Sequence, residues 1–134
     1  MIGRFLLALG CVVLAVAGCS NHTANVNRRP QSGSTTAAPV DGVQSVTIRA
    51  DDTYRFTPDT ITVHPGKVRI TLINTGHAPH DFSLGGFPAD FVPLASGGQT
   101  STATFMAPAP GRYTFVCTIH VAQGQTGALI VLAN

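Results

Sequence analysis

Hydrophobic and polar residues alternate in short runs from about Val43 to Asn134, and glycines and prolines separate the runs. Alternation with a period of two, in segments rich in β-branched and aromatic residues, is typical of strands with one buried face. There is no helical stripe of useful length, and the segment FPADFVPLAS is expected to be at most a loop with a short turn of helix. The expected strands are VQSVTIR, YRF, TITV, KVRITLIN, HDFSL, TSTATFM, RYTFVC and GALIVLA. Seven to eight short strands predict an all-β fold, a Greek-key β-sandwich.

The pattern before residue 43 is different. The first residues, MIGRFLLALGCVVLAVAGCS, combine a positive charge at Arg4 with an apolar core and small residues before a cysteine, which is typical of a secretion signal. The run from Val16 to Cys19 resembles the lipobox of bacterial lipoproteins, in which the signal is cut before the cysteine and this cysteine carries the lipid. A transmembrane helix is the alternative, because the apolar run is near the lower length limit for spanning a bilayer.

We therefore expect three parts: a lipoprotein signal peptide over residues 1–18, a lipidated N-terminus with a disordered tether over 19–42, and a folded domain over 43–134. The tether is rich in Ser, Thr, Asn, Ala and Pro and has no run that could bury an apolar face. This organisation predicts an extracytoplasmic protein that Cys19 anchors to the bacterial cell membrane through lipid.

Charge excludes one class of partner. Without Arg4, seven basic residues stand against six acidic ones, and the charges of residues 43–134 cancel. No basic face for nucleic acid is indicated, so we expect none as a partner.

Maturation also changes the cysteine count, because Cys11 leaves with the signal and lipid consumes the thiol of Cys19. Cys117 remains, and an unpaired thiol in an oxidising compartment is prone to oxidation unless it is buried or held by a metal. The alternative is a structural cysteine that is buried in the core as a small hydrophobic residue. His120 follows three residues later and His80 lies about forty residues upstream, and this pattern favours a metal site. A thiolate with two imidazoles and a weak axial ligand suits copper in both oxidation states.

The two segments that hold these residues, APHDFSL and YTFVCTIHVAQGQTG, resemble the ligand segments of small single-domain cupredoxins such as plastocyanin, amicyanin and pseudoazurin. The segment RFTPDTITVHPGKVRITLIN is similar to the N-terminal strands of the same family. The resemblance implies one copper ion held equatorially by His80, Cys117 and His120. It also implies that a monomer meets redox partner proteins at the membrane through an apolar patch, here Ala78, Pro79, Val121 and Ala122 with Phe87 as a possible addition.

Two positions depart from the family pattern. The axial methionine is replaced by Gln125, which could bind copper through its amide oxygen, as in stellacyanin-like cupredoxins, or only brace the loop. Met106 is expected in the core and not at the metal. The asparagine that commonly follows the first histidine is Asp81, which could hydrogen-bond Thr118 beside the ligands or be a solvated loop residue. His77 is expected to be a loop residue.

These expectations lead to a membrane-tethered blue copper protein that carries single electrons and is not an enzyme. Multicopper oxidases need further domains with paired His-x-His motifs, and a dinuclear copper centre needs two cysteines. An extracytoplasmic lipoprotein that binds or delivers copper is the alternative, because an amide oxygen at the axial position stabilises Cu(II).

Overall fold

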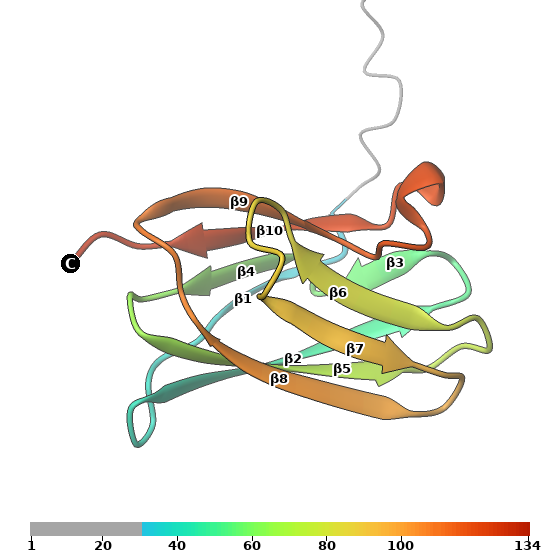
Figure 1. The fold of residues 1–134 in the computed structure, drawn as a ribbon, viewed down its shortest axis with the longest axis horizontal. Coiled ribbons are helices and arrows are strands. Elements are labelled where there is room, and N and C mark those ends of the chain that lie inside the picture. The colour runs from blue at the N-terminus through green and yellow to red at the C-terminus, as the bar shows by residue number, and fades with distance from the viewer. Residues whose placement is uncertain (1–30) are drawn as a thin grey trace, which may run out of the picture.

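The computed structural model describes residues 31–134, which form two β-sheets packed face to face (Figure 1). Ten strands and one short 3-10 helix, η1 (Val121–Gln123), follow one another along this range. The strands are β1 (Ser34–Thr36), β2 (Val43–Asp51), β3 (Arg55–Thr57), β4 (Thr60–Val63), β5 (Lys67–Asn74), β6 (His80–Leu84), β7 (Phe91–Ala95), β8 (Thr100–Met106), β9 (Gly111–Val116) and β10 (Thr126–Val131). The larger sheet has the order β1-β4-β10-β9-β6-β7, and the smaller has the order β3-β2-β5-β8. The predicted all-β sandwich is confirmed.

Strict alternation builds the smaller sheet. In β2 the buried positions are every second residue, and β5 follows the same rule. The two strands pair in parallel over eight residues, so their apolar side chains share the inner face. Met106 illustrates the same rule, because Phe105 points inward and Met106 is 61% exposed at the end of β8. The expectation that Met106 lies in the core is therefore wrong.

Three phenylalanines lie at the centre of the core, and two of them belong to β6, which begins at His80, and to β9, which ends one residue before Cys117. The ring of Phe115 is 4.7 Å from that of Phe82 and 5.2 Å from that of Phe56, measured between centroids. Phe82 comes two residues after His80, and Phe115 comes two residues before Cys117. Because side chains alternate along a strand, each ligand points to the same side as its buried phenylalanine. The core strands therefore carry both ligands to one end of the sandwich, on its inner side.

The strand count is higher than the seven to eight expected, and β7 accounts for part of the difference. Residues 87–96 were expected to be a loop with a short turn of helix, but Phe91–Ala95 pairs with β6 in an antiparallel ladder. Pro93 interrupts the local strand signal. A proline is tolerated here because β7 is an edge strand of its sheet, where the backbone groups on one side have no neighbouring strand to pair with.

The expected tether also ends earlier than residue 42. Ser34–Thr36 pairs in parallel with β4, and Ala37 is buried beside it. Before this strand, the carbonyl of Gly33 accepts hydrogen bonds from the amides of Asp59 and Thr60. Backbone hydrogen bonds of this kind need no apolar run, so composition gives no sign of them. The predicted signal peptide, Cys19 and the first part of the tether lie outside the described residues, and within 31–134 no helix has the length and apolar character to cross a membrane.

Candidate metal centre

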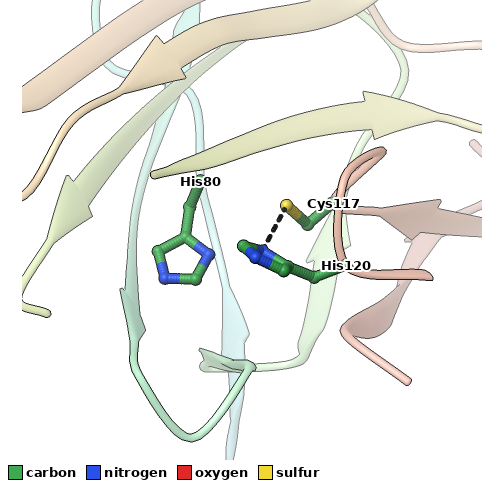
Figure 2. A group of neighbouring side chains, drawn as sticks. All are labelled: His80, Cys117 and His120. Carbon is green, nitrogen blue, oxygen red and sulfur yellow. Dashed lines mark hydrogen bonds between the residues drawn. The ribbon is translucent and has the colours of Figure 1, made fainter. Parts of the chain in front are cut away.

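Three expected ligands meet at one end of the sandwich. His80, Cys117 and His120 each offer a ligand atom, and these atoms lie within 4.8 Å of one another. Figure 2 shows the three side chains converging from β6 and from the loop after β9. His80 and Cys117 are fully buried, whereas His120 is partly exposed. The Cys117 sulfur lies 3.4 Å from Nδ1 of His120.

The loop that carries Cys117 and His120 is closed by its own backbone. The His120 amide donates to the Cys117 carbonyl at 3.2 Å, and the Gln125 amide donates back to the His120 carbonyl at 3.2 Å. The Cys117 amide in turn donates to the Gln125 carbonyl at 3.0 Å. Gly124 allows the chain to reverse, because its φ of 79° lies in the left-handed region that favours glycine. These bonds bring Gln125 back beside Cys117, although the two residues are eight positions apart in the sequence.

Gln125 is fully buried, and its side chain faces the same place. Its amide oxygen accepts a hydrogen bond of 2.9 Å from Nδ1 of His80. The amide nitrogen makes a long contact of 3.5 Å with the Arg55 carbonyl. A buried oxygen that touches one expected ligand is in the right neighbourhood for an axial donor, and it also braces the imidazole.

Asn74 was not singled out by the sequence, yet it holds the loop that leads to His80. This buried side chain donates to the carbonyls of Ala78 and Ala95 at 2.7 and 2.9 Å and accepts from the Gly76 amide at 2.9 Å. In a sequence, an asparagine at the end of a strand usually indicates a turn. Its bracing role depends on β7, which supplies the Ala95 carbonyl and which the sequence pattern also failed to indicate.

Asp81 and Thr118 connect the two ligand segments. The Thr118 amide donates to one oxygen of the Asp81 carboxylate at 2.6 Å, and the Thr118 hydroxyl donates to the other. Asp81 is therefore not simply a solvated loop residue. Its carboxylate fastens the residue after His80 to the residue after Cys117, so the two segments keep a fixed separation.

Burial governs the electrostatics of the buried ligands. Burial raises the pKa of the Cys117 thiol, while a backbone hydrogen bond from Asp81 opposes this rise by favouring the thiolate. Burial also lowers the pKa of His80, although its hydrogen bond with Gln125 partly opposes the shift. Among the described residues, Nε2 of His80 is a buried polar atom with no hydrogen-bond partner. A metal ion binds a neutral imidazole and a deprotonated thiol. Burial favours the neutral ring of His80, and a bound cation would supply the positive charge that a buried Cys117 thiolate needs.

The chemistry of this donor set fits one copper ion. Soft sulfur suits Cu(I), and imidazole nitrogen suits both oxidation states. The described residues contain no other group of three His, Cys, Asp or Glu side chains that could hold a metal. His77 does not join the group, because its exposed ring pairs with Asp52 at 2.9 Å.

The surface around the site differs in part from the expected apolar patch. Val121 is 51% exposed and Pro79 and Ala122 are exposed, as expected near His120, but Ile119 is 49% exposed there and was missed. Phe87 is not part of this surface. It follows β6, at the end opposite His80, and packs on Tyr113 with 5.4 Å between ring centroids.

Comparison with known proteins gives the same picture of the fold. Auracyanin A, a "blue" copper protein from the green thermophilic photosynthetic bacterium Chloroflexus aurantiacus, is 26% identical with a TM-score of 0.59, and the match covers 67% of this chain and 99% of that one. The reduced auracyanin from Roseiflexus castenholzii is 24% identical with a TM-score of 0.59, and the match covers 66% of this chain and 97% of that one. The metal-binding domain of the Cu(I)-exporting P-type ATPase CopA of Streptococcus pneumoniae, solved with Cu(I), is 17% identical with a TM-score of 0.61, covering 77% and 99%.

No curated protein matches the sequence at a significant level. The sequence does match the family described as Cupredoxin-like domain, over residues 10–131. This range includes all the strands from β1 to β10 and the three converging side chains. The chain therefore belongs to the family of cupredoxin-like domains.

Proposed function

We propose that the protein is a type I copper protein that carries one electron at a time and is tethered to the outer side of the bacterial cell membrane. The observation that carries this proposal is the convergence of the ligand atoms of His80, Cys117 and His120 within 4.8 Å at one end of the sandwich. When bound, copper supplies the redox chemistry by alternating between Cu(I) and Cu(II). The residues supply the ligands, their fixed geometry and the exclusion of water.

The rigidity of the ligand loops supports electron transfer. Backbone hydrogen bonds close the loop from Cys117 to Gln125, and the Asp81 carboxylate joins it to the segment that holds His80. Ligands that are held in place by the fold change position little between oxidation states. A small change in position means a small reorganisation cost for each electron transferred.

We assign Gln125 as the axial ligand through its amide oxygen. The oxygen is buried and 2.9 Å from His80 Nδ1, so it needs no large movement to face a metal held by that ring. An amide oxygen is harder than a thioether and stabilises Cu(II), so this assignment predicts a lower potential than methionine would give.

His120 is the route by which electrons enter and leave, because it is the one residue of the three that is not fully buried. Ile119 and Val121 flank it in sequence and are about half exposed, so the surface at this point is apolar. Exposed apolar patches are typical of docking surfaces, and the proposed partners are redox proteins at the membrane. The lipid anchor at Cys19 would keep the domain near them.

Delivery of copper is the second candidate function. It is favoured by the same partial exposure of His120, because a ligand at the surface can be exchanged for one from an acceptor protein. The two functions make different demands on the bound ion. A carrier keeps its copper through repeated redox cycles, whereas a delivery protein passes copper to an acceptor.

The test begins with the absorption spectrum of the purified protein with Cu(II). An intense visible band from thiolate-to-copper charge transfer is expected, and its absence would refute the copper site proposed here. Repeated reduction and oxidation in the presence of a Cu(I) chelator then separates the two functions. Retention of copper over many cycles supports the carrier, and loss within the first reduced phase supports delivery.

A further inference from the structure

The aromatic ring of Tyr54 lies against both histidines of the candidate metal centre. Tyr54 belongs to the turn between β2 and β3, far in sequence from either histidine. Its ring centroid is 4.6 Å from that of His120, with an interplanar angle of 43°, and 6.5 Å from that of His80. The contact with His120 is close enough for direct packing of the two rings. Because His120 is the ligand that is partly exposed, Tyr54 covers a ring that would otherwise have more freedom to move.

The backbone of Tyr54 adopts a conformation that a tyrosine rarely takes. Its φ is +56°, in the left-handed region, where bulky side chains are uncommon and the backbone is strained. The turn is nevertheless well specified, because the Tyr54 amide donates to the Asp51 carbonyl at 3.0 Å and the Thr53 amide donates to the Asp51 carboxylate at 2.9 Å. A glycine would suit this backbone position better. An aromatic residue here points to a role for the ring.

The same turn is attached to the loop that carries His80. One oxygen of the Asp52 carboxylate accepts hydrogen bonds from the amides of His77 and Ala78 at 2.8 and 2.9 Å. Gly76 makes this approach possible, because a Cβ at that position would lie 2.4 Å from the Asp52 oxygen. In Figure 1 the turn between β2 and β3 and the loop between β5 and β6 lie at the same end of the sandwich. Asp52 therefore fixes the turn, and with it Tyr54, to the framework of the metal centre.

We propose that Tyr54 is a positioning residue for His120, which holds the imidazole in its ligand orientation and slows the release of copper. The proposal rests on the copper site described under the proposed function. Packing of one imidazole face against the tyrosine ring restricts rotation of the His120 side chain. A ligand that cannot rotate away recombines with the metal before a competing chelator can replace it.

Three variants test this role. Tyr54→Gly removes the ring and suits the left-handed backbone, so the turn is expected to keep its conformation. Tyr54→Phe keeps the ring and is expected to behave like the wild type. Tyr113→Leu is the matched control, because it removes the other tyrosine of the chain, whose ring packs on Phe87 away from the metal centre.

The first readout is NMR of the metal-free proteins at a fixed pH. In Tyr54→Gly the ring protons of His120 are expected to lose the ring-current shift caused by Tyr54 and to show faster side-chain motion. The second is the rate at which bathocuproine disulfonate removes Cu(I). Removal is expected to be about threefold to tenfold faster in Tyr54→Gly, the range that loss of one aromatic pair gives. Tyr54→Phe and Tyr113→Leu are expected to match the wild type in both readouts.

The results that would overturn the proposal are distinct from those that would overturn the copper site. Wild-type resonances of His120 and a wild-type rate of Cu(I) removal in Tyr54→Gly would show that the ring does not position the ligand. Equal acceleration in Tyr113→Leu would show a general loss of stability instead. If the wild type took up no copper, the proposed function would fail, and the His120 resonances of the metal-free proteins would still decide whether Tyr54 holds the ring.

Discussion

Replacing Gln125 with methionine separates two roles that this side chain could have, a ligand of copper and a brace for His80. In the metal-free protein the brace is directly visible, because the buried amide oxygen accepts a hydrogen bond of 2.9 Å from His80 Nδ1. A thioether is only a weak acceptor. Nε2 of the same ring already has no partner among the described residues, so the variant leaves both nitrogens of a buried imidazole poorly satisfied.

The cost can be worked out for the metal-free state. A buried donor left without its acceptor costs about 1–3 kcal/mol. Methionine is more favourable than glutamine in a buried place, which offsets part of this cost, so we expect a net loss of about 1 kcal/mol. For a domain of this size such a loss lowers the midpoint of thermal unfolding by about 4–8 °C. Calorimetry of the metal-free proteins measures it.

The copper-loaded proteins report on ligation. If the amide oxygen is the axial ligand, the softer thioether should favour Cu(I), and the reduction potential should rise while the blue colour stays. A change of about 60 mV corresponds to a tenfold change in the one-electron equilibrium, about 1.4 kcal/mol, and we expect a rise of at least this size. Voltammetry at matched pH measures the shift.

Gln123→Met is the matched control, because Gln123 is exposed in η1 two residues earlier in the same loop. It should change neither the unfolding midpoint nor the potential. A bracing role alone predicts that Gln125→Met lowers the unfolding midpoint of the metal-free protein and shifts the potential by less than the roughly 60 mV of a tenfold change in equilibrium. An unchanged or lowered potential in Gln125→Met would therefore remove Gln125 from the ligand set.

Four further predictions concern the other parts of the molecule. Cys117→Ser should abolish the intense visible band of the Cu(II) protein, because the charge transfer needs the thiolate; a retained band in the absorption spectrum would contradict the blue copper assignment. Cys19→Ala should leave the spectrum normal and end membrane association, and a variant that still sediments with membranes until detergent is added would exclude the lipid anchor. Gly127→Ala should lower the free energy of unfolding in urea by about 1–3 kcal/mol, because its Cβ would lie 2.2 Å from the Phe115 ring; unchanged stability would show that the ring can move. Hydrogen bonds from the Ala78 amide, the His77 ring and the His77 amide lower the pKa of Asp52 from 3.8 to about 2. The stability that Asp52 contributes should thus be complete above pH 3.8 and disappear as the pH falls through about 2; urea titrations of wild type and Asp52→Ala should converge over that range, and parallel curves would refute the linkage.

Local sequence signals were sufficient for the strands that form the core. The alternation in β2 and β5 follows from the two-residue period of a strand, which any sequence with one buried face must show. The same reasoning failed for β7, where Pro93 is tolerated only because the strand is at an edge. It failed again for β1, whose polar residues join the sheet through backbone hydrogen bonds and have no apolar pattern to read.

In the metal centre too, one part of the arrangement follows from the sequence and another part only from the tertiary structure. The three-residue spacing of Cys117 and His120 is a local property of one loop, so the sequence alone could pair them, and the resemblance of two short segments to cupredoxins could add His80. Only the tertiary structure placed the Gln125 oxygen against His80 and the Tyr54 ring against His120. These contacts join residues that are 45 and 66 positions apart in the chain. They depend on how the sheets pair and pack, and a contact between distant residues leaves no periodic pattern in the sequence of either one.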